Sequence, residues 1–437
     1  MQASVPVRIE RVVAGGWGLA HVGSMVTFVR GTIPGETVRI ATQETHHRYQ
    51  VATLSEVLEA SAERVQPACG VYGHCGGCQF QHVKYEAQLI QKQRLLEEAL
   101  SRIGRVSINQ FEPPMPSPLP YEYRSWVRFT VFRERGGFHL GFRRERSHQA
   151  VPAAGCMLVP KSMRRVVEEI EIRLATLKKL PVFLSSVELR SSSAFGNTLI
   201  IFRGMVSRQE EACLLFQLFK GLPTVVGQVF IASPDSSSRR KLGLRWVEGD
   251  DHLSERFHKL VVRISDRAFM PANWSVYETI AQSVAEWMGS PDRLRVLALF
   301  SGIGCLGLFQ ARNGALVTEV EENPFALADA RKSASMNHVG RCRFRHAKAE
   351  TYLSQVAKGD YDWVIVDPPR VGLSRECVES LGRIKAPGLL YLSCDAQTLA
   401  RDLGRLCESG YRIVRAKVFD MFPQTAHVET LVQLAYS

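Results

Sequence analysis

The order of apolar and polar segments after residue 290 constrains the fold more than any other feature of the sequence. An apolar segment, Leu294–Phe300, runs into a glycine-rich turn and a helical segment, and a second apolar segment, "ALVTEVE", follows. Further apolar segments lie in "YDWVIVDPP" and "LLYLS". Strands that alternate with helices in this way predict a doubly wound parallel sheet. Such sheets bind ligands beyond the carboxyl ends of their strands.

The glycine-rich turn predicts a nucleotide-type cofactor site. Gly302, Gly304 and Gly307 form a G-x-G-x-x-G pattern after the first strand, and Glu321 lies nineteen residues after Gly302. Glycines let the backbone approach a ligand, and an acid at this spacing can bind ribose hydroxyls. Both a dinucleotide and S-adenosylmethionine fit this pattern.

The next strand distinguishes between these two cofactors. It ends at Asp367-Pro368-Pro369, and two prolines stop a strand and stiffen the loop at its carboxyl end. Methyltransferases that act on nucleic-acid bases commonly have such an element, whereas a hydride-transfer enzyme has no particular use for it. An NAD-dependent iron–sulfur oxidoreductase is therefore disfavoured. The alternative for the prolines is an ordinary turn.

A thiol lies between an apolar segment and a predicted helix in "YLSCDAQTLARDL", as Cys394. Loops at the ends of strands often carry function, although free cysteine is also a common small buried residue. A helix that starts after Cys394 would favour its thiolate through the helix dipole.

The N-terminal part of the chain differs in pattern from the C-terminal part. Residues 1–60 contain short alternating strands broken by glycines, which predict a small barrel. We expect a helix over 82–103, a connector in the proline-rich "EPPMPSPLPYEY", and a hairpin with Gly136-Gly137 at its turn.

Three cysteines lie within ten residues, as Cys69, Cys75 and Cys78, and Cys156 could supply a fourth ligand. A disulfide framework is not expected in a chain of this size and kind. Both zinc and iron–sulfur clusters accept four thiolates, and the spacing does not separate them. Free structural thiols are the remaining alternative.

The chain carries 55 Lys and Arg against 43 Asp and Glu, a net charge of +12. This excess favours a polyanionic partner, nucleic acid before membrane, although general basicity is an alternative. No apolar run reaches the roughly 18 residues that span a bilayer, and the N-terminus lacks a secretory signal pattern. We therefore expect a cytoplasmic protein without a membrane partner.

Together these motifs resemble the RNA 5-methyluridine methyltransferases, and within that family the iron–sulfur-containing branch that acts on 23S ribosomal RNA. The resemblance covers nearly the whole chain. It rests on "GGWGLAHVGSMVTFVRGTIPGE", the four cysteines, "LFSGIG", "DPPR", "YLSCDAQTLARDL" and "DMFPQTAHVE". It implies three units: a TRAM-like OB barrel that binds RNA, a central α+β domain with the cluster, and a class I methyltransferase domain of the Rossmann-like type. Their expected bounds are 1–60, 61–265 and 266–437.

The resemblance also implies residue roles. Cys394 matches the nucleophile, Glu429 the general base, and Cys69, Cys75, Cys78 and Cys156 the ligands of a 4Fe–4S cluster. The positions that match S-adenosylmethionine contacts are Phe300, Gly302, Gly304, Glu321 and Asp367. The chemistry agrees with these roles, because C5 of uracil becomes nucleophilic only after a thiolate adds at C6, and a base must then remove the C5 proton.

Several positions depart from the family pattern. Pro271 stands where a cofactor-holding Gln is common, whereas Asn273 is kept. Cys305 replaces a common Asn in the glycine loop, and Lys348 stands where a polar or acidic residue approaches the adenine. These departures bear on cofactor affinity and substrate choice.

The sequence thus predicts an S-adenosylmethionine-dependent uridine C5 methyltransferase acting on structured RNA, with 23S ribosomal RNA first and transfer RNA as an alternative. The target base would be flipped out of its stack. An RNA-binding protein of the same fold with little methyl transfer is the second hypothesis, and Pro271 is its best support. We expect a monomer.

Overall fold

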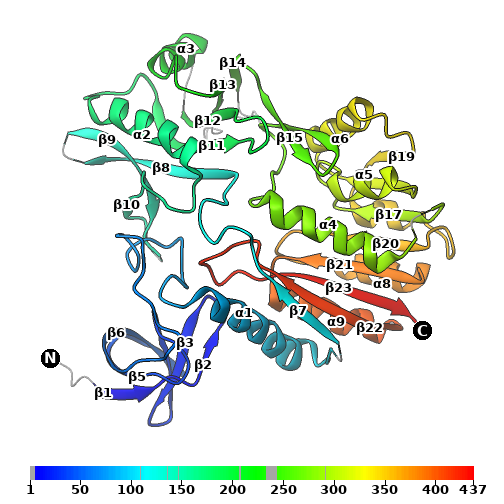
Figure 1. Ribbon diagram of the computed structural model, residues 1–437, viewed down its shortest axis with the longest axis horizontal. Coiled ribbons are helices and arrows are strands. Elements are labelled where there is room, and N and C mark those ends of the chain that lie inside the picture. The colour runs from blue at the N-terminus through cyan, green and yellow to red at the C-terminus, as the bar shows by residue number, and fades with distance from the viewer. Residues whose placement is uncertain are drawn as a thin grey trace.

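A computed structural model describes residues 5–108, 110–134, 136–145, 147–205, 208–232, 244–290 and 292–437. Three large sheets organise the described chain (Figure 1). Among the described residues, no helix is long and apolar enough to cross a membrane.

The N-terminal sheet has six strands in the order β1-β5-β6-β4-β3-β2 and curls on itself (Figure 1). Its strands are β1 (Val5–Arg8), β2 (Arg11–Val13), β3 (Trp17–Val22), β4 (Met25–Val29), β5 (Thr37–Thr45) and β6 (Tyr49–Glu59). The buried Glu36 carboxylate accepts hydrogen bonds from the Arg64 guanidinium at 2.5 and 2.6 Å, which ties the following segment to this sheet.

The middle sheet has seven strands in the order β10-β9-β8-β11-β12-β13-β14. Its strands are β8 (Trp126–Glu134), β9 (Gly137–Arg143), β10 (Ala150–Pro152), β11 (Phe183–Ser191), β12 (Thr198–Met205), β13 (Val225–Ala232) and β14 (Arg245–Gly249). Helices α2 (Lys161–Ala175) and α3 (Gln209–Leu218) bury their apolar residues in one core with this sheet. The predicted hairpin is confirmed, because β8 and β9 pair antiparallel up to Glu134 and Gly137.

The C-terminal sheet has eight strands in the order β19-β18-β17-β20-β21-β23-β22-β7. Its strands are β7 (Phe111–Met115), β17 (Arg295–Leu299), β18 (Leu316–Glu321), β19 (Cys342–His346), β20 (Trp363–Val366), β21 (Gly388–Ser393), β22 (Tyr411–Phe419) and β23 (Glu429–Tyr436). The five strands from β19 to β21 are parallel, which confirms the predicted doubly wound sheet.

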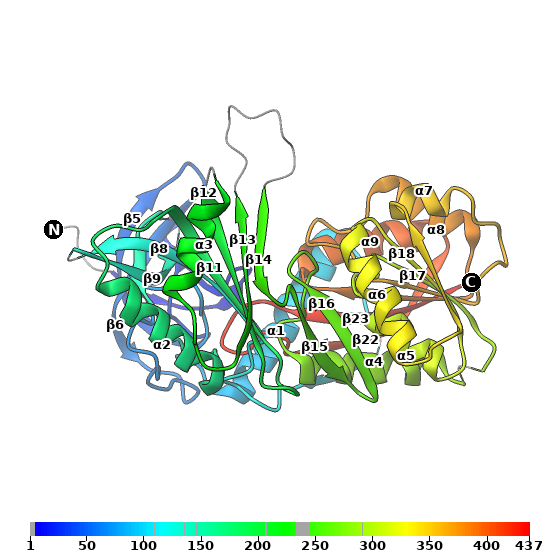
Figure 2. The same ribbon diagram turned by 90° about the horizontal axis from the view of Figure 1, so that it is seen from above.

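Helices cover both faces of the C-terminal sheet (Figure 2). One core contains α1 (Tyr85–Ala99), α7 (Ala349–Leu353), α8 (Arg375–Ile384) and α9 (Ala396–Glu408). The other contains α4 (Trp274–Met288), α5 (Cys305–Arg312) and α6 (Pro324–Met336). Helix α1 falls within the predicted 82–103 and continues as a π-helical turn, η1 (Leu100–Gly104).

The proline-rich segment is more ordered than predicted. It was expected to be a connector, but it begins with β7, which pairs parallel with β22 at the edge of the C-terminal sheet. An edge strand tolerates Pro113 and Pro114 because one side of it needs no ladder hydrogen bonds.

Two segments from the middle of the chain pack against the C-terminal sheet or its helices. One comprises α1 and β7, and the other is the hairpin of β15 (His252–Phe257) and β16 (Leu260–Ser265), whose β16 contacts α6. The division at residues 60 and 265 stays a prediction.

Candidate active site

The glycine loop and its acid come together as predicted. The loop follows β17, where Phe300, Gly302 and Gly304 all have positive φ angles of 56°, 56° and 79°. The Gly302 amide donates to Glu321 Oε2 at 2.8 Å, and the Asn323 amide donates to Oε1 of the same carboxylate at 2.7 Å. Backbone donors therefore fix the Glu321 carboxylate at the carboxyl end of β18.

A second acid, which sequence reasoning missed, lies beneath the same loop. A Cβ atom at Gly304 or Gly307 would come within 2.4 or 2.3 Å of the Glu319 carboxylate. Burial raises the pKa of Glu319 well above its ordinary value, which favours its neutral form. The two glycines thus accommodate a buried carboxyl group, and the only sequence signal was an acid two residues before Glu321.

Asp367 lies at the end of β20, beside the glycine loop. Its amide donates to the Leu299 carbonyl at 3.4 Å, which links the carboxyl ends of β20 and β17. Loss of hydration raises the pKa of Asp367 to about 7, and the nearby Glu321 carboxylate acts in the same direction. Two acids therefore face the region where the resemblance places the cofactor.

The register of β21 and β23 brings the predicted nucleophile and base together. Ser393 pairs with Thr430 in this antiparallel pair, so the next residues in register, Cys394 and Glu429, lie opposite each other. The Glu429 carboxyl group acts to raise the pKa of the Cys394 thiol, in agreement with this register. Two residues 35 positions apart in the sequence thus meet at one end of the sheet.

We expected the surroundings of Cys394 to favour its thiolate, but they favour the protonated thiol. Its pKa is raised to about 11, chiefly by burial; Glu429 and Asp367 act in the same direction, and Arg370 opposes them. The helix that follows supplies no free N-terminus, because the Asp395 side chain already accepts hydrogen bonds from the first-turn amides of α9.

Glu429 is buried, and burial raises its pKa well above its ordinary value. Asp367 raises the pKa of Glu429 further, whereas Arg370 lowers it. Arg370 is therefore the cation shared by the thiol and the carboxyl group. Sequence reasoning gave it no role, although it directly follows the two prolines at the end of β20.

His427 lies two residues before Glu429, and its surroundings favour its neutral form. Its ring lies 3.4 Å from the Arg370 guanidinium and packs against Phe422. Burial lowers the pKa of His427 to about 4, and Arg370 contributes in the same direction.

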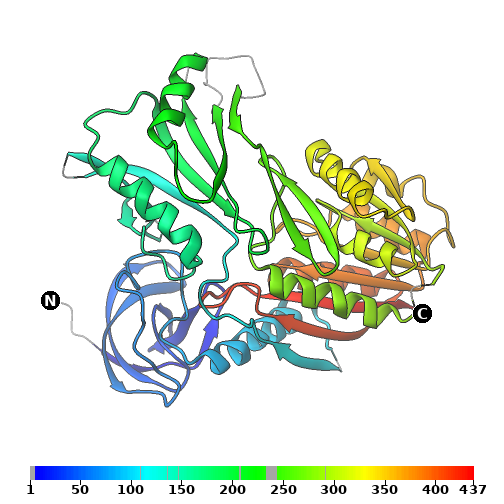
Figure 3. The ribbon, with the colours of Figure 1, turned by 45° about the horizontal axis from the view of Figure 1, so that its top comes forward.

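The loop 420–428, which leads to Glu429, is held by segments from other parts of the chain. Lys92 Nζ on α1 donates to Asp420 Oδ1 at 2.5 Å and to the Phe422 carbonyl at 2.9 Å. The amides of Gln79 and Phe80 donate to the Gln424 carbonyl at 3.1 and 3.0 Å. Figure 3 shows this loop reaching from the C-terminal sheet towards the N-terminal sheet.

The retained Asn273 and two of the departing residues, Cys305 and Pro271, have clear structural positions. Asn273 caps α4 and also donates to Ser117 Oγ at 3.0 Å. Cys305 is fully buried at the start of α5. The Pro271 carbonyl accepts a hydrogen bond from the Ser125 hydroxyl.

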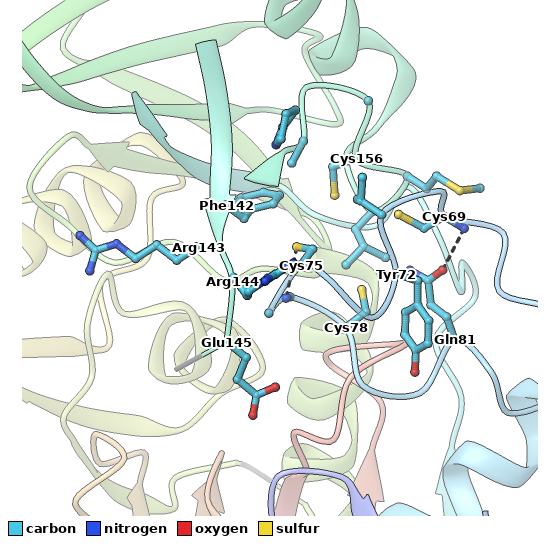
Figure 4. Close-up of a pocket in the computed structure, with 18 of the residues that line it drawn as sticks. Cys69, Tyr72, Cys75, Cys78, Gln81, Phe142, Arg143, Arg144, Glu145 and Cys156 are labelled. Atoms are coloured by element: carbon cyan, nitrogen blue, oxygen red, sulfur yellow. Dashed lines mark hydrogen bonds between the residues drawn. The ribbon is translucent and has the colours of Figure 1, made fainter. Parts of the chain in front are cut away.

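The four predicted metal-ligating cysteines line one cavity of about 980 Å³ (Figure 4). Cys69, Cys75 and Cys78 come from the segment before α1, and Cys156 comes from the loop after β10. Burial raises the pKa of Cys78 to about 12. Across the described ranges, no three His, Cys, Asp or Glu side chains gather closely enough to hold a single metal ion.

The chain is similar to known RNA methyltransferases. The family model described as tRNA (Uracil-5-)-methyltransferase matches residues 84–436. Two relatives described as uncharacterized RNA methyltransferases are each 30% identical. The one from Thermosynechococcus vestitus matches over 100% of this chain and 98% of its own length, and the one from Aquifex aeolicus over 98% and 97%.

A solved structure shares the whole fold. It is the crystal structure of the Pyrococcus abyssi tRNA (uracil-54, C5)-methyltransferase in complex with S-adenosyl-L-homocysteine. The likeness has a TM-score of 0.76 and covers 98% of this chain and 99% of that chain, at 23% sequence identity. This agreement confirms a multidomain fold with an N-terminal curled sheet and a C-terminal methyltransferase-like sheet.

Proposed function

The chain belongs to the tRNA (uracil-5-)-methyltransferase family and is an RNA methyltransferase of that uracil-C5 family, and we propose that it methylates C5 of a uridine through a covalent bond from Cys394 to C6. The observation that carries this proposal is the register of β21 and β23, which sets Glu429 opposite Cys394. A thiol and a carboxyl group at the ligand-binding end of a doubly wound sheet are the two groups that the reaction requires.

The proposed reaction proceeds by addition of the thiolate, methyl transfer and removal of a proton. The Cys394 thiolate forms the Sγ–C6 bond, and the electron pair of the C5–C6 double bond moves into an enolate. S-adenosylmethionine would supply the methyl group: the bond from C5 to the methyl carbon forms as the S–CH3 bond of the sulfonium breaks, and S-adenosylhomocysteine leaves as a neutral thioether. Glu429 then removes the C5 proton, the double bond re-forms, and the Sγ–C6 bond breaks to release Cys394.

Arg370 has two tasks in this scheme. Its guanidinium favours the Cys394 thiolate, whose pKa is otherwise raised to about 11. It also favours the carboxylate form of Glu429, the form that accepts a proton. Attack by a thiolate and proton removal by a carboxylate both need deprotonated groups, so the rate should rise with pH through the neutral range.

We propose that S-adenosylmethionine binds at the carboxyl ends of β17, β18 and β20. The residues assigned to it are Phe300, Gly302, Gly304, Glu321 and Asp367. The positive φ angles of the loop and the fixed Glu321 carboxylate support this assignment. Carboxyl groups there suit a cofactor with ribose hydroxyls and a positive charge.

We propose that the four cysteines hold an iron–sulfur cluster rather than a single zinc ion, because their pattern resembles that of the iron–sulfur-containing branch. A zinc ion draws thiolate sulfurs to about 2.3 Å from one point. A cluster of four irons and four sulfides keeps its thiolates farther apart, and the four thiols here surround one cavity. We propose that this 4Fe–4S cluster holds the middle of the chain in place and takes no part in methyl transfer.

The proposed substrate is structured RNA, with 23S ribosomal RNA first because the cysteine pattern resembles the branch that acts on it. Transfer RNA is the alternative. In this proposal residues 1–60 form a TRAM-like RNA-binding unit, 61–265 the cluster domain and 266–437 the methyltransferase domain of a monomeric cytoplasmic enzyme. The net charge of +12 supports a polyanionic substrate.

The test is to map 5-methyluridine in RNA from cells that lack the gene, and then to restore it with purified protein and S-adenosylmethionine. Cys394→Ala should abolish methylation and leave RNA affinity nearly unchanged. Cys213→Ala, at an exposed cysteine outside the site, is the matched control. Protein that binds RNA but restores no methyl group would favour the RNA-binding hypothesis.

A further inference from the structure

We propose that a basic groove at the outer edge of the C-terminal sheet binds the phosphodiester backbone of the substrate RNA, away from the methylated base. The proposal rests on the proposed function only in taking RNA as the substrate. The groove is a cavity of about 860 Å³ along β18, β19 and α7. Its polar lining includes Arg341, Arg343, Arg345, His346, Tyr352 and Tyr361.

Strand alternation directs two arginines into the groove. Cys342 and Phe344 of β19 pack against the core that contains α5 and α6. Arg343 and Arg345 alternate with them and therefore project from the opposite face of the sheet, the face that α7 covers. Both arginines are exposed.

The groove keeps an uncompensated positive charge. Arg295 is neutralised by Asp362, at 2.6 Å, and Arg341 lies 3.8 Å from Asp292. Within the described part of the chain, neither Arg343 nor Arg345 has a carboxylate within 4.0 Å. Asp360 is the one acidic residue among those that line the groove. Free guanidinium groups of this kind bind phosphate oxygens.

A pair of tyrosines adds neutral donors to the wall of the groove. The Tyr352 and Tyr361 hydroxyls lie 2.8 Å apart, so one donates to the other, and the Thr318 side chain also hydrogen-bonds to Tyr361. Burial raises the pKa of Tyr361 to about 12, which keeps its hydroxyl protonated at pH 7. Arginine and tyrosine together are common contacts to nucleic-acid phosphates.

The dimensions favour a chain of phosphates over one small anion. Arg341 and Arg345 are four residues apart on an extended segment, which at about 3.3 Å per residue spans about 13 Å. Strand β19 lies four strand spacings of about 4.8 Å from β21, or about 19 Å across the sheet. An RNA that reaches both Cys394 and this groove must therefore extend well beyond the methylated loop.

Charged side chains on an edge strand also have a simpler explanation, because they prevent pairing with another chain. The experiment separates the two roles. It compares wild-type protein with the Arg343→Gln/Arg345→Gln variant, using a fluorescein-labelled RNA hairpin with a uridine-containing loop and a short stem, and the same hairpin with its stem extended by several helical turns. Affinity is measured over a range of salt concentrations, and the oligomeric state by light scattering.

We expect the variant to bind the long hairpin more weakly, with the slope of log affinity against log salt reduced by about 1.4 to 1.8, the value for two lost phosphate contacts. Affinity for the short hairpin should be unchanged. The control variant Arg375→Gln/Arg412→Gln removes two exposed arginines outside the groove and should match wild type. Equal melting temperatures would show that all three proteins are folded.

An unchanged salt slope for the long hairpin would overturn the proposal. If the slope is unchanged and the variant also self-associates, the arginines protect the edge strand from pairing with another chain. Equal losses for both hairpins would also overturn it, because the contact would then lie near the loop. If RNA is not the substrate, so that the proposed function is wrong, the wild-type protein will bind neither hairpin.

Discussion

At the scale of single residues, the site concentrates acids where few cations oppose them. Asp367 lies near both Glu321 and Glu429, and Arg370 is the cation that lowers the pKa of Glu429. An acid whose pKa is raised by burial weakens the folded state once it ionises. The free energy of unfolding of the protein without cofactor therefore depends on pH.

Asp367→Asn should stabilise the protein without cofactor at neutral and alkaline pH. The pKa of Asp367 is raised from 3.8 to about 7, so its favourable protonated form is fully present below pH 4 and is lost as the pH rises through 7. The difference in free energy of unfolding between variant and wild type should grow from near zero at pH 4 to at most about 4 kcal/mol above pH 7. Urea unfolding at several pH values measures it. Asp292→Asn, at an exposed position, is the control, and a difference independent of pH would refute the assignment.

The residues that the sequence predicted and those that it missed differ in a physical way. Cys394 and Glu429 were predicted because the proposed reaction requires those residue types and their motifs resemble those of the methyltransferase family. Arg370 and Glu319 were missed because their effects depend on burial and on neighbours that only the folded sheet supplies.

At the scale of elements, the loop 420–428 positions Glu429, the proposed base. Lys92 and Asp420 are both fully buried and form an ion pair, and Lys92 also binds the Phe422 carbonyl. Burial lowers the pKa of Lys92, and Asp420 opposes that shift. The pair fixes α1 against the loop that leads directly to Glu429.

Lys92→Met should cost about 3–5 kcal/mol in the free energy of unfolding, because it leaves Asp420 buried without its partner. Lys84→Met, which removes an exposed pair with Glu63 at 3.9 Å, should cost less than about 1 kcal/mol. Urea denaturation compares them. Lys92→Met/Asp420→Asn should recover part of the loss, and a Lys92→Met variant as stable as Lys84→Met would disprove the role of the pair.

Elements were predictable where local pattern decided them. The parallel strands and the hairpin at β8 and β9 follow from periodicity and glycine turns. The position of β7 was not predictable, because its proline-rich sequence lacks strand character and only the free edge of β22 makes it a strand.

At the scale of the whole molecule, the segment 69–80, which carries Cys69, Cys75 and Cys78, connects parts of all three sheets. Cys78 directly precedes Gln79 and Phe80, whose amides hold the Gln424 carbonyl. A Cβ atom at Gly16 of the N-terminal sheet would come within 3.0 Å of Ala426 in the same loop. Cys156 comes from the middle sheet, so a bound cluster would join these parts. The meeting of four cysteines from two distant segments was expected only through family resemblance.

Protein purified without oxygen should be brown and contain about four irons per chain. Cys75→Ala should bleach it and lower its melting temperature, because the segment that anchors the loop 420–428 loses its cluster. Cys407→Ala, at a cysteine outside the cavity, should keep the colour. Stoichiometric zinc without iron would contradict the cluster.

The most direct test of the central claim is to remove the proposed base and trap the reaction before its last step. Glu429→Gln keeps the size of the side chain but cannot accept the C5 proton. With methyl-acceptor RNA and S-adenosylmethionine, the variant should form a protein–RNA adduct that survives denaturation, detected by gel shift and mass spectrometry. The adduct should contain the added methyl group, and the Cys394→Ala/Glu429→Gln variant should not form it. Normal turnover by Glu429→Gln, or no adduct although the variant binds RNA and cofactor, would contradict the account.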